Sequence, residues 1–411
     1  AKRPIHDQFA VRVYLSRPRM FLMLAQLPDA WTFEPGVTFL NHGSFGPSPD
    51  VVRRARERYS DELERQPMDF IVRRMEDRLD VAAAKLAEFV GAKPQNLAFI
   101  PNATCAMNVV IASTELNPGG EVLFTDQEYG AVVRAWGRLC GRVGARTVLA
   151  HLPSPAESAD AIVAAIQERI TSRTRMLVVS HVTSQTATVF PVEAICRAAR
   201  QAGVPVCIDG PHALAMRPLQ LDSIGCDYYC ASGHKWLSAP FGSGALYVAP
   251  RRQSALVPSI TSWGRSLSGR EGRWQDELHW FGTYDPAPYL AMVDAIEFLE
   301  GFGLDRFRRE THALAREARE RLIRSAHAEP LTADSDEWYG SMVTLRLPRV
   351  ATSSSWPGKP HPLQVALWEQ HRIEAPVVQW KDQLHIRISC HLYNSSADID
   401  RLIEAVASCV K

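Results

Sequence analysis

The chain has 411 residues, more than a single hydrophobic core ordinarily serves, so we expect a large domain and a smaller one. Its 46 lysine and arginine residues nearly balance 45 aspartate and glutamate residues, and the net charge of +1 gives no field that would draw nucleic acid or an anionic membrane. The eight cysteines are scattered and form no CxxC pair, so neither a disulfide framework nor a metal site is expected, and reduced thiols in a cytoplasmic protein are the simpler interpretation.

The N-terminal segment 1–38 is predicted to be an arm that packs on the body of the protein. Its apolar run MFLMLAQL at 20–27 follows several basic residues, as in a signal peptide, but lacks a small-residue cleavage site. No stretch of the sequence approaches the ~20 apolar residues that cross a membrane. We therefore expect no membrane partner.

Two helices are predicted after the arm, at 51–66 and 73–90, before the pattern changes to short apolar strands separated by helices. The predicted strands are 97–100, 121–125, 147–151, 176–182, 204–209, 227–231 and 244–249. The helices between them are 104–114, 129–143, 155–171 and 191–203. This alternation is typical of a mainly parallel seven-stranded α/β sheet with helices on both faces.

A compact α+β domain is predicted for the C-terminal part of the chain. Helical regions at 287–302 and 304–326 lead to strands near 341–347, 374–378 and 383–389, with helices near 362–371 and 396–409 and an exposed loop at 351–362. The expected domains are thus a large one at 39–290 and a small one at 291–411.

An acid and a lysine lie at the ends of two predicted strands of the sheet. Asp209 ends one strand, and Lys235 follows another in the motif SGHKW at 232–236, so both groups are expected in one crevice beside the sheet. Pyridoxal 5'-phosphate (PLP) needs this pair, because its aldehyde forms an imine with a lysine and a carboxylate keeps its ring nitrogen protonated. The backbone at Ala103 and Thr104, where a strand ends and a helix begins, offers amides for its phosphate.

Ordered motifs along nearly the whole chain from about residue 30 resemble the class V aminotransferase family of fold-type I PLP enzymes, and within it the isopenicillin N epimerase-like branch. The motifs are FLNHGSFGPSP (39–49), NATCAMN (102–108), DQEYGAVVRAW (126–136), HVTSQTATVFPVEAI (181–195), DGPHAL (209–214), SGHKWLSAPFGSGALYV (232–248), GTYDPAPYL (282–290), HRIEAPVV (371–378) and IRISCHLYN (386–394).

The resemblance implies roles for particular residues. Lys235 corresponds to the lysine that carries the cofactor, Asp209 to the partner of the ring nitrogen, and His212 to a donor near the ring hydroxyl. The implied phosphate ligands are Ser232, His234 and Thr104. Tyr129 corresponds to the aromatic group stacked on the ring, Ser184 lies near the ring hydroxyl, and Arg387 corresponds to the arginine that holds the substrate carboxylate. Gly282 and Thr283 match a loop that reaches the phosphate of a neighbouring subunit, which implies a homodimer with shared sites.

Several of these residues also have an ordinary structural explanation. Tyr129 would then be a core residue at a helix start, Ser184 a turn former, Thr283 a helix cap and Arg387 a strand arginine paired to a surface acid. Asn41 and His42, in the motif NHGSFG, are further candidates for the substrate entrance.

The cofactor leaves the reaction open, because PLP labilises a bond at the α-carbon of an amino acid and the protein selects which. In an epimerase, Lys235 removes the α-proton and a second group, for which Tyr129 and His42 are the candidates, returns it on the other face. In a carbon–sulfur β-lyase acting on an S-substituted cysteine or its sulfoxide, as in secondary metabolism, one base suffices. A persulfide-forming desulfurase is disfavoured, since 351–386 contains no cysteine.

Other reactions and a non-catalytic role rank lower. An aminotransferase and a decarboxylating or oxidative enzyme use the same cofactor. A protein that keeps the fold only for binding would be expected to lose the lysine or the acid, and both are present. The segments 65–74 and 263–280 are rich in arginine or tryptophan and are candidates for bordering a substrate larger than alanine.

Overall fold

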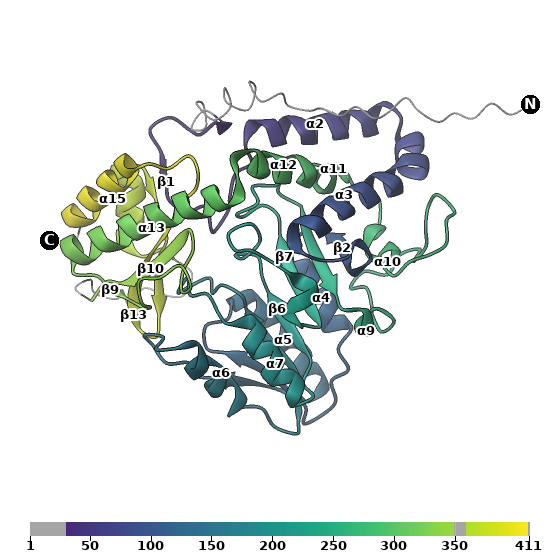
Figure 1. Cartoon of the computed structure of the whole chain (residues 1–411), viewed down its shortest axis with the longest axis horizontal. Helices are drawn as coiled ribbons and strands as arrows, with labels where there is room; N and C mark the ends of the chain where they lie inside the picture. Colours follow the sequence, from purple (N-terminus) through teal and green to yellow (C-terminus); the bar gives the residue numbers. More distant parts are fainter. Residues whose placement is uncertain (1–29, 349, 351–358, 410–411) are drawn as a thin grey trace, which may run out of the picture.

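Seven strands form the central sheet of the computed structural model, which describes residues 30–348, 350 and 359–409 (Figure 1). Their order across the sheet is β2-β8-β7-β6-β5-β3-β4. The strands are β2 (Leu97–Ile100), β3 (Glu121–Thr125), β4 (Arg146–Ala150), β5 (Thr174–Ser180), β6 (Val206–Asp209), β7 (Tyr228–Ser232) and β8 (Gly244–Val248). Strand β8 runs antiparallel to both its neighbours, and the other pairings are parallel. The prediction of a mainly parallel seven-stranded sheet is confirmed.

Apolar side chains alternate between the two faces of this sheet. In β2, Leu97 and Phe99 belong to one buried cluster, while Ala98 and Ile100 belong to another. The first cluster is completed by α3 (Met75–Val90), α6 (Ala159–Gln167), α7 (Val192–Gln201) and α12 (Met292–Phe302), and the second by α4 (Ala103–Ala112) and α5 (Gly130–Val143). The sheet is therefore covered on both faces, which is why its central strands are mostly apolar and buried.

A second, smaller sheet belongs to the C-terminal part, which lies to one side of the large sheet in Figure 1. Its strands, in the order β12-β13-β10-β9, are β12 (Val377–Trp380), β13 (Gln383–Ser389), β10 (Met342–Arg346) and β9 (Glu329–Pro330). A third apolar cluster joins this sheet to α13 (Leu304–Ala326), α14 (Pro362–His371) and α15 (Ser396–Cys409). The two-residue strands β1 (Thr38–Phe39) and β11 (Ile373–Glu374) pair with each other, so the chain near residue 40 is tied to the C-terminal part.

The remaining elements are short or flank the sheet. They are α2 (Asp50–Arg65), the π-helix η2 (Asp69–Arg74), the 3-10 turn η3 (Pro94–Asn96), α8 (Leu221–Ile224), α9 (Pro250–Gln253), α10 (Asp276–His279) and α11 (Ala287–Leu290). Among the described residues, no helix is long and apolar enough to cross a membrane.

Some predicted elements have different limits in the structure. The helix predicted at 287–302 is divided into α11 and α12, and that predicted at 155–171 is shortened to α6, because Ser158 caps its start with a hydrogen bond to Ala161 N–H. The strand predicted at 374–378 is interrupted at Ala375 and Pro376, between β11 and β12. The apolar run at 20–27 and residues 351–358 of the predicted loop lie outside the described residues.

Candidate active site

The cavity that holds the predicted chemistry lies at the carboxyl ends of the parallel strands. It has a volume of about 660 Å3, and residues that follow β2, β3, β5, β6 and β7 line it. Parallel strands end at one edge of a sheet, and so residues distant in sequence meet there. The predicted site residues that line the cavity are Ala103, Thr104, Tyr129, Ser184, Asp209, His212, Ser232, His234, Lys235 and Arg387.

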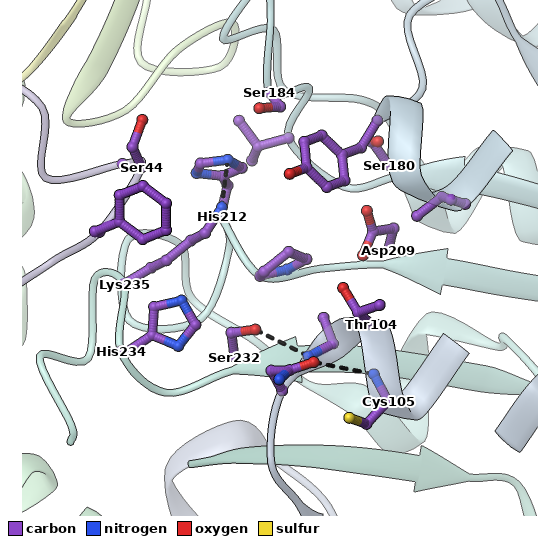
Figure 2. Close-up of a pocket in the computed structure, with 18 of the residues that line it drawn as sticks. Ser44, Thr104, Cys105, Ser180, Ser184, Asp209, His212, Ser232, His234 and Lys235 are labelled. Atoms are coloured by element: carbon purple, nitrogen blue, oxygen red, sulfur yellow. Dashed lines mark hydrogen bonds between the residues drawn. The ribbon is translucent and has the colours of Figure 1, made fainter. Parts of the chain in front are cut away.

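Lys235 is buried beside His212, and its amine loses its proton more readily than that of an ordinary lysine. Figure 2 shows it joined to His212, whose Nε2 lies 2.9 Å from Lys235 Nζ, while Trp236 Nε1 donates to Nδ1 of the same imidazole at 3.4 Å. Because Nδ1 accepts, the ring proton is on Nε2 and Nζ accepts it. Burial and the nearby Arg387 lower the pKa of Lys235 to about 7, against a partial opposing effect of Asp209. A neutral amine at neutral pH is the form that attacks an aldehyde.

Asp209 faces the cavity with its carboxylate unpaired. It is 5% exposed, and no donor among the described residues bonds to its side chain, although Lys235 is near enough to stabilise its charge. Burial raises the pKa of Asp209 to about 6. A buried carboxylate in this state favours a partner that carries a positive charge on an N–H group.

Donors gather at the β2 side of the cavity. Ser232 Oγ accepts the Ala103 N–H at 2.9 Å, which leaves the serine hydroxyl proton free to donate, and Asn102 Oδ1 accepts the Cys105 N–H at 3.0 Å. The amide of Thr104 lies between them in the first turn of α4, where a helix has no acceptor of its own. His234 adds a buried Nδ1 with no partner in the described structure. This group of donors suits an anion.

Arg387 lies on β13, in the C-terminal part, and reaches into the same cavity. It donates to Ser184 O (2.6 Å), Ser44 Oγ (2.6 Å) and Asn41 Oδ1 (3.2 Å), and no acid among the described residues forms an ion pair with it. Burial lowers the pKa of Arg387 to about 10, so it remains a cation at neutral pH. A cation 4% exposed and surrounded by neutral oxygens has an uncompensated charge, and a carboxylate could compensate it.

Four of the predicted site residues do not line the cavity. His42 is fully buried beside the lysine loop, and Asn41 contacts Arg387 rather than the cavity. Gly282 and Thr283 follow α10, and Thr283 is exposed. The segments 65–74 and 263–280 also contribute no residue to the cavity wall.

Sequence reasoning missed several residues of the site. Ser44, Phe45, Ser180 and Cys105 line the cavity, and Glu128 lies behind it, 6% exposed and bonded by Ser180 Oγ and Thr125 Oγ1 at 2.6 Å each. Burial, with the nearby Asp209, raises the pKa of Glu128 to about 7. The signal for Ser180 was its place at the end of a strand, directly beside Asp209 in the sheet register.

The groups present fit PLP. An unpaired carboxylate, a neutral lysine amine and a set of anion donors around one cavity, together with the orphaned His234 Nδ1, correspond to the ring nitrogen, aldehyde and phosphate of that cofactor. The fold and the site are thus those of a PLP-dependent enzyme of fold type I.

Comparison with known sequences identifies the family of this chain. Residues 46–402 match the family model described as aminotransferase class-V. The chain is 36% identical over 395 residues to isopenicillin N epimerase of Amycolatopsis lactamdurans, which covers 91% of this chain and 96% of that protein. It is 37% identical over 391 residues to the isopenicillin N epimerase of Streptomyces clavuligerus, covering 91% and 95% of the two chains. The chain belongs to the class V aminotransferase family, a family of PLP-dependent enzymes.

More distant similarities agree with this membership. A putative L-cysteine desulfhydrase of Oryza sativa subsp. japonica is 28% identical over 428 residues, 95% of this chain and 87% of that protein. Among solved structures, a variant of C-DES with glycine covalently linked to its PLP cofactor has a TM-score of 0.78 at 20% identity, covering 93% of this chain and 98% of the other. That likeness shows the fold.

Proposed function

We propose that the protein is a PLP-dependent epimerase that inverts the α-carbon of an amino-acid substrate. The observation that carries the proposal is that two proton-transfer groups, the Lys235 amine and the Tyr129 hydroxyl, line one cavity together with the unpaired cation of Arg387. They follow β7 and β3, which lie on either side of β6 in the sheet, and β6 ends at Asp209. Two groups approaching from different sides are what inversion requires. The relatives named isopenicillin N epimerase support the same reaction type.

We assign the cofactor contacts from the same geometry. Asp209 would hold the proton on the ring nitrogen, and Ser232, His234 and the first turn of α4 at Ala103 and Thr104 would bind the phosphate. His212 and Ser184 would donate to the ring hydroxyl, and Tyr129 would lie over the ring. When bound, PLP withdraws electrons from the α-carbon of an attached amino acid, so that a bond to that carbon is weakened.

The remaining steps depend on side chains of this chain. Arg387 binds the substrate carboxylate through its two-pronged guanidinium and thereby fixes which α-carbon bond faces Lys235. Lys235 removes the α-proton as a neutral amine, a state that its lowered pKa supplies at neutral pH. Tyr129 returns a proton on the opposite side.

A carbon–sulfur β-lyase is the second candidate. It needs only the first proton transfer, and the desulfhydrase relatives support it at lower identity. A persulfide mechanism lacks a suitable thiol, because Cys105 is the cysteine among the described residues of the cavity wall and burial raises its pKa. Cys390 is buried in the small-sheet core.

Deuterium oxide separates the two reactions. An epimerase incubated with an L-amino acid in deuterium oxide should yield product of inverted configuration carrying α-deuterium, detected by mass spectrometry after chiral separation. A β-lyase should instead release pyruvate and a sulfur product from S-substituted cysteine. Pyruvate without any inverted amino acid, across candidate substrates, would overturn the epimerase proposal.

The lowered pKa of Lys235 predicts how attachment of PLP to the cofactor-free protein depends on pH. Only the neutral amine reacts, so the attachment rate should rise as pH increases through about 7 and level off above it. A lysine with its ordinary pKa of 10.5 would give a rate that still rises at pH 9. The growth of absorbance near ~420 nm after mixing gives the rate at each pH.

We also propose a homodimer, in which Gly282 and Thr283 serve the phosphate of the other copy. Their distance from the cavity wall of their own chain and the exposure of Thr283 support this proposal. A solution mass equal to the 45.8 kDa of one chain, measured by light scattering at micromolar concentration, would contradict it.

All eight cysteines are unpaired, which supports a reducing, cytoplasmic location.

A further inference from the structure

Three segments that are distant in sequence meet behind the catalytic lysine. His42 comes from the N-terminal motif, His391 and Tyr393 follow β13, and Ser238 follows Lys235. The imidazoles of His42 and His391 are fully buried and stacked, with ring centroids 4.0 Å apart. None of these side chains lines the cavity. Of these side chains, His42 contacts the backbone that carries the lysine, and the others contact one another.

The protons in this cluster have one consistent arrangement. His42 Nε2 lies 2.9 Å from Lys235 O, and a carbonyl oxygen only accepts, so Nε2 carries the proton. Burial lowers the pKa of His42 to about 3, which keeps the ring neutral. Nδ1 is then an acceptor, and Tyr393 donates its hydroxyl proton to it across 2.8 Å. A hydrogen-bond chain thus runs from Tyr393 through His42 to the Lys235 peptide.

This chain holds a part of the backbone that no regular element supports. Lys235 lies in a turn between β7 and β8, and its carbonyl accepts from both His42 and the Ser238 N–H at 2.7 Å. Gly46 donates to the neighbouring His234 carbonyl at 3.1 Å. A Cβ at Gly46 would lie 2.4 Å from His42 Nε2, so glycine is required for this close approach.

We propose that His42 and Tyr393 are positioning residues, which act on the Lys235 peptide so that its amine reaches His212 and the reacting carbon. The proposal rests on the proposed function in one respect, that Lys235 carries the cofactor. It assigns His42 a place behind the lysine instead of at the substrate entrance. A lysine side chain has four rotatable bonds, and hence a fixed peptide is needed for a fixed amine.

Tyr393→Phe tests the first bond of the chain and His42→Gln the second. Tyr393→Phe leaves His42 Nδ1 without a donor, and we expect PLP attachment to Lys235 to slow roughly ten-fold, with kcat falling by a similar factor and KM little changed. His42→Leu should slow PLP attachment more than Tyr393→Phe does. His42→Gln should attach PLP faster than His42→Leu, because the glutamine amide nitrogen can take the place of Nε2.

Tyr339→Phe is the matched control, because Tyr339 is also buried and bonds through its hydroxyl to Asp334, far along the chain from the lysine loop. Both tyrosine variants should have a lower melting temperature, but a positioning role predicts slower attachment only in Tyr393→Phe. Wild-type attachment in folded Tyr393→Phe and His42→Leu would overturn the inference. If His42→Leu does not fold, the attachment rate of Tyr393→Phe alone tests the inference. Failure of the wild-type protein to attach PLP would overturn the proposed function instead.

Discussion

Lys235→Ala is expected to abolish the absorbance near ~420 nm of the protein with PLP and to lower kcat by ~10³-fold or more. In the proposed mechanism, the amine that attaches the cofactor and the base that removes the α-proton are the same atom, Nζ. It lies in a buried position beside His212, and no other lysine lines the cavity among the described residues. Removing the amine therefore removes both cofactor attachment and proton transfer, and no neighbouring group is expected to replace them.

Spectroscopy and borohydride reduction check this expectation. Borohydride should fix the cofactor to Lys235 in the wild-type protein, seen as a mass increase of the peptide that contains it, and should fix none in the variant. Lys85→Ala is the control, because Lys85 is paired with Glu300 at 2.7 Å on the helices that flank the sheet. Retention of the band and of activity in Lys235→Ala would show that another amine carries the cofactor.

Arg387→Gln should weaken the use of amino acids with a free carboxylate while leaving cofactor attachment unchanged. The loss of a buried charge-assisted pair costs about 2–4 kcal/mol, which corresponds to a fall of roughly 30- to 1,000-fold in kcat/KM, mostly through KM. Glutamine retains donors for the oxygens of Ser184 and Ser44 but not the positive charge. For amino-acid amides, which lack the carboxylate, kcat/KM should fall much less in this variant.

Arg401→Gln is the matched control for this variant. Arg401 is also bonded by neutral oxygens alone, those of Thr38, Gly36 and His371, but it lies on α15 and does not line the cavity. Kinetics with an amino acid and its amide should separate the two arginines. Equal losses for the acid and the amide in Arg387→Gln would mean that this side chain maintains structure and does not bind the carboxylate.

The order of strands and helices was predictable because it depends on local patterns. Short, largely apolar runs such as 121–125 indicate strands covered on both sides, and Gly91 and Gly144 mark helix ends by their left-handed backbone. The interruption at Pro376 and the division of the helix at 287–302 were missed. They depend on which neighbours supply hydrogen bonds, and periodicity carries no information about that.

The site was predictable where chemistry demands a residue type next to a strand end. Asp209 and Lys235 met that condition, and the structure brings both to one cavity. Glu128 did not, because a glutamate between a glutamine and a tyrosine looks like any polar turn until folding buries it next to Ser180. The lowered pKa of Lys235 likewise follows from burial and from the nearby Arg387, which depend on the tertiary structure.

By itself, the sequence predicted the fold class, the cofactor and the pair Asp209 and Lys235 as the residues proposed to hold it, since each follows from short-range patterns and from the chemistry of individual side chains. Only the tertiary structure decided what surrounds them. It placed Arg387 without an acidic partner, so that its charge is available to a substrate carboxylate. It also moved His42 from the expected entrance to a buried position behind the lysine, because β1 pairs with β11 and carries the following residues into the core. Distances between groups on different strands depend on how the strands and helices pack, and no single segment of the sequence determines that packing.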